Sequence, residues 1–203
     1  MNQYARIVQN NLERLFDDPQ RVAMLDRTLP AERRGDAFMF RAFGRDCSLS
    51  PHRIELNATR IQGVRAILVS LYALHAGPTQ PILEPFDAYK SFPGSAPYAA
   101  AFAARTEGVL VPHVERLMAR DQQLFTALDL PPKRFSLPGD LNWVVRPLPK
   151  IYLAYICYGA DEDFPASVRC LFSNNACRFL PLDALADVGE YTSREILQRL
   201  SSE

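Results

Sequence analysis

The segment from Leu148 to Phe172 constrains the fold more than any other part of the chain. In residues 150–158, apolar and aromatic side chains occupy both faces of an extended strand. Such a strand is typical of the middle of a sheet, or of a sheet that is covered on both sides. Residues 167–172 form a second, shorter apolar strand. The turn between them carries three consecutive acids, Asp161-Glu162-Asp163. The sequence therefore predicts a β-hairpin with negative charge at its tip.

The acidic turn has two interpretations. Adjacent carboxylates repel one another, and an exposed turn tolerates this because water and salt screen the charges. In that case the turn is simply solvated. If the turn is closed, one carboxylate needs a raised pKa or a cation beside it. The second interpretation is therefore a site for a hard metal ion or another positively charged group.

Composition limits the class of protein. The chain has 203 residues, of which 48% are hydrophobic, enough to bury the core of one domain over residues 1–203. Lysine plus arginine and aspartate plus glutamate both number 23, so no net field favours nucleic acid. No apolar run reaches the roughly 18 residues of a membrane-spanning helix. The N-terminal residues also lack the apolar stretch of a signal peptide. We expect a cytoplasmic protein with no nucleic-acid or membrane partner.

Hydrophobic periodicity predicts the elements around the hairpin. Helical patterns cover residues 3–16, 20–29, 62–76, 96 to about 105, about 110–129 and 181–200, the last with a break near Gly189. Strand patterns cover residues 36–43, 47–49, 53–56, 141–146 and 178–180. The helix over 62–76 is apolar on most faces, which favours burial. The prediction is an α+β fold: one antiparallel β-sheet packed by this buried central helix and the C-terminal helix. Residues 95–130 would add a helical layer or flap.

The acids near the hairpin are the main candidates for a functional site. Asp140 begins a strand that should neighbour the hairpin, so it could meet Asp161 and Asp163 in space. Carboxylates and turn carbonyls could together supply the oxygen ligands of a divalent metal. Alternatively, Asp140 and Asp163 bond backbone amides in their own turns, and Asp163→Ala would then weaken the hairpin. The candidate site residues are Arg45, Asp46, Asp140, Lys150, Asp161, Glu162 and Asp163.

Histidine and cysteine give weaker signals. His75 lies near the end of the 62–76 helix, where a cation and a carbonyl suit it. It is either an end-of-helix histidine or an axial ligand to a tetrapyrrole. Cys157, Cys170 and Cys177 could approach one another as a thiolate metal site, although cysteine in apolar strands commonly packs as a small apolar residue. No motif supplies a base for a cysteine nucleophile.

Short motifs follow one another along nearly the whole chain. They are Phe43-Gly44-Arg45-Asp46, Leu71 to His75, Phe92-Pro93-Gly94, Gly139-Asp140, Leu148 to Ile151, Gly159 to Ser167, Leu171-Phe172 and Leu180 to Leu200. In this order they resemble the domain-of-unknown-function family 3786, which is found chiefly in anaerobic bacteria and archaea. The resemblance implies no established reaction. It implies a context, because some relatives carry iron–sulfur domains or occur in redox and one-carbon metabolism. This chain lacks cluster-ligating cysteine spacing, so no cofactor follows from that context.

Two functions follow from these patterns. The first is an accessory module of anaerobic redox metabolism that binds a small ligand, or a protein partner from a redox or one-carbon pathway, in a cleft beside the hairpin. The second is an enzyme that uses the clustered carboxylates, with or without a divalent ion, for acid–base or hydrolytic chemistry. We favour the first because no nucleophile–base pair is evident in the sequence.

Overall fold

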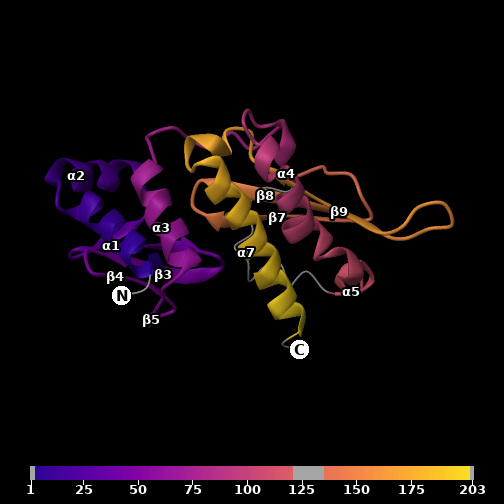
Figure 1. Cartoon of the computed structure of the whole chain (residues 1–203), viewed down its shortest axis with the longest axis horizontal. Coiled ribbons are helices and arrows are strands. Elements are labelled where there is room, and N and C mark those ends of the chain that lie inside the picture. The colour runs from indigo at the N-terminus through magenta and orange to yellow at the C-terminus, as the bar shows by residue number, and fades with distance from the viewer. Residues whose placement is uncertain (1–2, 121–134, 202–203) are drawn as a thin grey trace.

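A computed structural model describes residues 3–120 and 135–201 (Figure 1). The α-helices are α1 (Gln3–Phe16), α2 (Pro19–Thr28), α3 (Val64–His75), α4 (Ala96–Phe102), α5 (Val114–Met118) and α7 (Leu182–Ser201). The other helices are the 3-10 helices η1 (Tyr89–Ser91), η3 (Val111–His113) and η4 (Ala176–Arg178), and the π-helix η2 (Ala103–Gly108). The strands are β1 (Glu32–Arg34), β2 (Ala37–Ala42), β3 (Arg45–Ser50), β4 (Arg53–Leu56), β5 (Thr59–Arg60), β6 (Asp87–Ala88), β7 (Leu141–Leu148), β8 (Ile151–Tyr158) and β9 (Ser167–Phe172).

The first sheet is an antiparallel meander in the order β1-β2-β3-β4-β5. Along its three central strands every second side chain is buried, the pattern of a sheet with one covered face. Helices α1 and α3 provide the cover (Figure 1). Phe16 of α1 lies 6.2 Å from Phe38 of β2, and Tyr72 of α3 lies 6.4 Å from Phe40, measured between ring centroids. The N-terminal half therefore has its own apolar contact layer between helices and sheet.

The second sheet is antiparallel in the order β6-β9-β8-β7, so β8 lies between two partners. Seven of its eight residues are buried. Leu153, Tyr155 and Cys157 face the main core, whereas Tyr152 and Ala154 belong to a smaller cluster on the opposite face. This confirms that the strand is covered on both sides. It also confirms the hairpin, since Tyr155 pairs with Cys170 across β8 and β9.

Helix α7 lies between the two halves of the molecule (Figure 1). It packs against α3 on one side and against α4 and η2 on the other. The α+β prediction is confirmed, with α3 and α7 as the packing helices and α4 to α5 as the additional layer. Within residues 3–120 and 135–201, none of the helices combines the length and apolarity that crossing a bilayer requires.

The structure corrects the expected single sheet. Its strands form two sheets, which meet where the backbone N–H of Phe43 donates to the carbonyl of Pro147 at 2.7 Å. The ladder between β7 and β8 is irregular between Val145 and Leu148. Pro147 has no N–H to donate, so a regular sheet cannot continue through this position.

Two local predictions were wrong. Residues 178–180 are not a strand, because the N–H of Phe179 donates to the carbonyl of Ala176 and turns the chain into η4. The C-terminal helix has no break, because α7 runs unbroken through Gly189, where the missing side chain makes room for Phe102 instead. Part of the helix expected over 110–129 lies outside the described residues.

Candidate functional site

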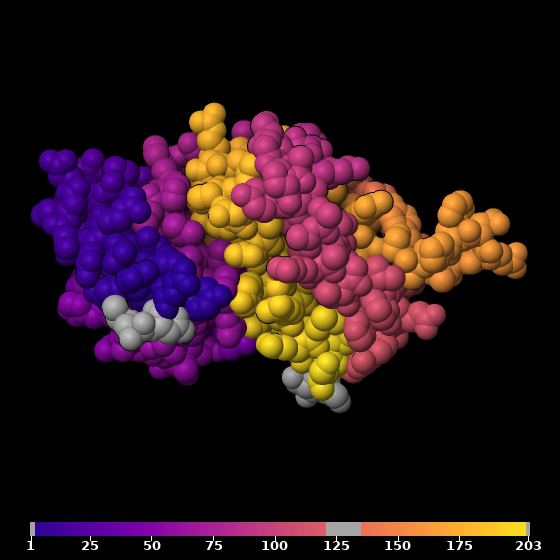
Figure 2. Space-filling view, viewed as in Figure 1, coloured from indigo at the N-terminus to yellow at the C-terminus, as the bar shows by residue number. Residues whose placement is uncertain are grey.

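The acidic tip of the β8–β9 hairpin projects from the body of the molecule as an arm (orange, right side of Figure 2). Its residues 160–165 are exposed. Asp161 Oδ1 accepts hydrogen bonds from the backbone N–H groups of Asp163 (2.9 Å) and Phe164 (2.7 Å). Aspartate commonly closes a turn in this way. Asp140 lies at the base of the arm, where its Oδ2 accepts from the N–H of Gly159 at 2.8 Å.

The carboxylate of Asp161 is thus bonded within its own turn, and that of Asp140 is bonded to the backbone of Gly159, just after β8. Glu162 and Asp163 are exposed at the tip. In the part of the chain that the structure describes, no three histidine, cysteine, aspartate or glutamate residues are grouped so as to hold a metal ion. The geometry of this region therefore supports the solvated acidic turn over a preformed metal centre.

The turn geometry predicts different effects for two neighbouring acids. Asp161→Ala should lower the free energy of unfolding by about 0.5–1.5 kcal/mol, because two backbone donors lose their acceptor. Asp163→Ala is the change that the sequence alone suggests. Because Asp163 is exposed, this substitution should change the free energy of unfolding by no more than about 0.5 kcal/mol. Urea unfolding of both variants checks this. Equal losses for the two variants would contradict the assigned roles.

Arg45 and Asp46 are neighbours on β3 but have different partners. Arg45 Nη2 donates to both carboxylate oxygens of Glu195 on α7, at 3.0 and 2.9 Å. Arg65 of α3 donates to the same carboxylate at 2.9 Å. The three residues lie on β3, α3 and α7, so this ion triad connects the first sheet to both helices. The Glu195 side chain is only 5% exposed, so its charge depends on the two arginines for compensation. Asp46 accepts from Arg41 at the surface, at 2.8 Å.

Lys150 is a buried cation at the turn between β7 and β8. Its Nζ donates to the carbonyl oxygens of Gly77 (2.7 Å) and Thr79 (3.1 Å), just after α3. Burial lowers the pKa of this ammonium group. Lys150 therefore holds the segment that leaves α3 against the second sheet. His75, in the last turn of α3, is exposed, and its Nδ1 lies 2.8 Å from the carbonyl oxygen of Leu71.

A different region has the features of a binding site. A cavity of about 370 Å³ opens between the edge of β9 and the helical segment α4–η2; we call it the β9 cleft. Its apolar walls are formed by Ala88, Tyr89, Ala99, Phe102, Ala103 and Leu171. Its charged residues are Lys90, Glu107 and Arg169. These come from η1, η2 and β9, segments that are distant in sequence, which is why no local motif indicates the cleft.

The cleft exists because β6 is short. Its two residues pair with Leu171 and Phe172, so the edge of β9 before Leu171 faces η2 instead of another strand. There Glu107 Oε1 accepts the backbone N–H of Cys170 at 3.0 Å. The carboxylate thus satisfies a strand-edge donor that a longer β6 would otherwise bond. The π-helical geometry of η2 is itself rare and is often found at functional sites.

Aromatic rings make one wall of the β9 cleft rigid. Tyr89 stacks on Phe102 with ring centroids 4.5 Å apart and an interplanar angle of 15°. Both rings also contact Phe172, at 5.9 and 5.6 Å. The Tyr89 hydroxyl donates to the carbonyl of Leu182 at 2.8 Å. A wall fixed in this way is preformed for a ligand rather than assembled around it.

Glu107 is the electrostatic centre of the cleft. Its side chain is only 13% exposed, and this burial raises the pKa of the carboxyl group. The N–H of Cys170 and the charges of Arg169 and Lys90 oppose the rise without cancelling it. Arg169 Nη1 lies 3.7 Å from Glu107 Oε2. A titratable group perturbed by burial and by specific charges in a cleft is a candidate functional residue.

The groups behind Glu107 are inert. Cys170 is fully buried, and burial together with Glu107 raises the pKa of its thiol well above the ordinary value. The hydroxyls of Tyr155 and Ser193 are hydrogen-bonded to each other at 3.0 Å, and Ser193 donates to the carbonyl of Thr106 at 2.8 Å. Cys170 is therefore a thiol that packs in the core, not a thiolate nucleophile.

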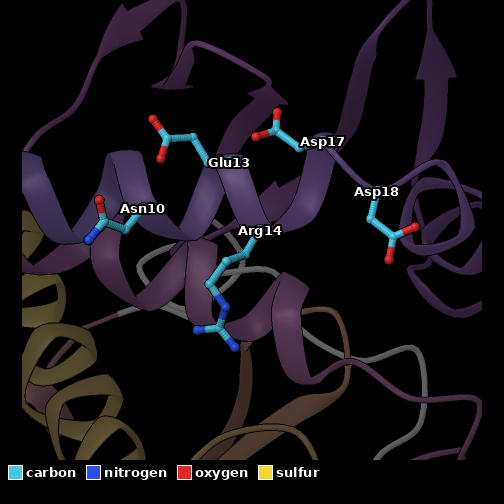
Figure 3. Close-up of a pocket in the computed structure, with 5 residues that line it drawn as sticks. All are labelled: Asn10, Glu13, Arg14, Asp17 and Asp18. Carbon is cyan, nitrogen blue, oxygen red and sulfur yellow. The ribbon is translucent and has the colours of Figure 1, made fainter.

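A larger hollow, about 490 Å³, lies along α1 and the turn to α2 (Figure 3). Its residues are Asn10, Glu13, Arg14, Asp17 and Asp18. Glu13 accepts from Gln9, and Asp18 accepts the N–H of Gln20 as the N-cap of α2. This hollow is an open part of the surface whose acids serve local structure, so the β9 cleft is the stronger candidate.

The fold and the cleft define an α+β domain with a lateral, largely apolar pocket that holds one nearly buried carboxyl group. The chain belongs to the family described as a domain of unknown function (DUF3786), whose model matches residues 21–195. This confirms the family that the motif order indicates. No curated protein and no solved structure matches the chain. The matched residues include the acidic hairpin and the whole lining of the β9 cleft.

Proposed function

We propose that this protein is a binding module whose ligand is a small molecule held in the β9 cleft. The volume of the cleft, about 370 Å³, falls in the lower part of the range of small-molecule sites, about 300–1,000 Å³. Such sites are mostly apolar with a few placed polar groups, which is the composition of this cleft. The observation that carries the proposal is Glu107, a nearly buried carboxyl group that lines the cavity together with Arg169 and Lys90.

Binding fits the geometry better than catalysis at the hairpin does. A carboxylate pair for acid–base chemistry needs two groups within reach of one substrate. The acids of the tip are exposed, and Asp161 is bonded within its own turn. In the cleft, Glu107 is bonded to a backbone amide, and the thiol behind it has a strongly raised pKa. These groups are suited to recognising a ligand and not to attacking it.

The proposal includes a setting. The resemblance to a family of anaerobes supports the proposal that this protein is a cytoplasmic accessory component and that its ligand, or a protein partner, belongs to redox or one-carbon metabolism. The cleft lies against β9, the second strand of the acidic hairpin, although none of its lining residues is among the site residues that the sequence suggests. The exposed Phe164 at the tip of the arm would then be free to contact a protein partner.

An NMR screen of a library of small organic molecules, read out through the backbone amide signals of the protein, tests the proposal. We expect a subset of the library to bind the wild-type protein and to shift backbone amide signals of the cleft walls. Ala103→Trp should abolish this binding, because it fills the cavity from an exposed position on η2. Ala104→Trp is the matched control, since Ala104 is also exposed on η2 but does not line the cavity. Equal binding to both variants, or none to the wild type, would contradict the proposal.

A further inference from the structure

The β9 cleft is lined by more cationic than acidic side chains. Lys90 on η1 and Arg169 on β9 are both exposed, and both line the cavity. Glu107 is the one acid among the lining residues. The cleft therefore carries a net charge of about +1 when Glu107 is ionised and about +2 when it is protonated. In either state the cleft attracts an anion.

Glu107 leaves both cations available to a ligand. Its Oε1 is engaged by the backbone N–H of Cys170. Its Oε2 lies 3.7 Å from Arg169 Nη1, which is too long for a strong charge-assisted hydrogen bond. The Arg169 side chain is 65% exposed, so its other guanidinium donors reach solvent. Burial also raises the pKa of Glu107, and the neutral carboxyl group would repel an anion less.

The walls of the cleft require an apolar body on the ligand. The stacked rings of Tyr89 and Phe102 and the side chain of Leu171 offer apolar surface and few hydrogen-bonding groups. A compact anion such as inorganic phosphate would leave this surface wet. A cation would meet repulsion from Lys90 and Arg169. The combination of walls and charges therefore selects for a molecule that is apolar over most of its length and negative at one end.

We propose that the ligand of the β9 cleft is a small organic anion, with its apolar body against Tyr89, Phe102 and Leu171 and its charged group between Lys90 and Arg169. This inference rests on the proposed function and narrows it to one chemical class. The cleft is large enough for an organic anion with a short chain or a ring, and it is too small to enclose a macromolecule.

Amide-detected NMR titrations with four probes test the inference: hexanoate, hexanol, hexylamine and inorganic phosphate. Hexanoate should shift the amide signals of Ala88, Ala103 and Arg169 more than the other probes do at equal concentration. Lys90→Gln and Arg169→Gln should each weaken hexanoate binding by about tenfold, the loss typical of one charge-assisted contact. Arg105→Gln is the control, because Arg105 lies on η2, the π-helix that also carries Glu107, and pairs with Glu190 outside the cleft. Its affinity should match that of the wild type.

The outcomes separate the inference from the proposed function. If hexanol or hexylamine shifts the cleft signals and hexanoate does not, the anion assignment is overturned while a ligand-binding cleft stands. If phosphate binds as tightly as hexanoate, the apolar body of the ligand contributes nothing to affinity, and the assignment of an organic anion is overturned. If none of the probes shifts the cleft signals, the inference fails. The proposed function fails with it only when the library screen is negative too.

Discussion

Replacing Gly189 by valine is expected to lower the free energy of unfolding by about 3 kcal/mol, the upper end of the usual cost of overpacking a core. A Cβ atom at Gly189 would lie 2.6 Å from Phe102 Cε2 and 3.0 Å from Thr106 Oγ1. The ring of Phe102 cannot move away easily because it is stacked on Tyr89 and packed against Phe172. Valine would normally favour a helix over glycine, so a loss of stability would isolate the packing effect. Urea unfolding monitored by circular dichroism measures it.

A double-mutant cycle provides the control. Phe102→Leu removes the atoms nearest to position 189, so the loss caused by Gly189→Val should be smaller by at least about 1 kcal/mol in the Phe102→Leu background. Gly189→Val should also reduce binding in the β9 cleft, because Phe102 is one of its walls. Additive effects, or a stabilised Gly189→Val variant, would show that the contact between α7 and the α4–η2 segment is not as close as described.

Glu195→Gln is the second large change. It should lower the free energy of unfolding by about 2–3 kcal/mol, somewhat below the usual cost of breaking a buried ion pair, because the two arginines are partly solvated. Glu195 is 5% exposed, whereas the side chains of Arg45 and Arg65 are each 32% exposed. The variant leaves two cations close together without the carboxylate between them. Chemical unfolding at low salt gives the value directly.

Asp46→Asn is the matched control for Glu195→Gln. Asp46 pairs with Arg41 at an exposed site next to Arg45, so Asp46→Asn should lower the free energy of unfolding by no more than about 0.5 kcal/mol. The Glu195→Gln effect should persist in high salt more than the Asp46→Asn effect, since a buried pair is screened less. If both substitutions cost the same, the triad would not be the connection between the first sheet, α3 and α7 that its hydrogen bonds describe.

Local chemistry made much of this fold predictable. Both faces of residues 151–158 are apolar, and β8 is indeed a strand with a partner on each side. The helix over 3–16 and the strand over 167–172 follow from simple periodicity. Gly189 misled the prediction, because a glycine in a helical pattern indicates either a break or a close contact, and only the position of Phe102 decides between them.

The candidate site was harder to predict. The acids of the hairpin are adjacent in sequence and therefore suggest a site. In an exposed turn, however, adjacent acids are commonly just solvated. Lys90, Glu107 and Arg169 are far apart along the chain and become neighbours only through the short β6 and the placement of η2 on β9. Lys150 illustrates the same limit, since its carbonyl acceptors lie more than seventy residues earlier in the chain. Spacing along one segment cannot reveal contacts that the sheet edge creates.

The pKa of Glu107 tests most directly the central claim, which is that the β9 cleft is a binding site. A carbon-13 NMR titration of its side-chain carboxyl group measures the pKa in the presence of the neighbours that face it, namely Lys90, Arg169, Cys170 and Tyr155. We predict a midpoint above the 4.5 of an unperturbed glutamate, and a further rise when hexanoate is added, because a bound anion disfavours the carboxylate beside it. A midpoint at or below 4.5 that hexanoate leaves unchanged would contradict the account of the β9 cleft as a binding site.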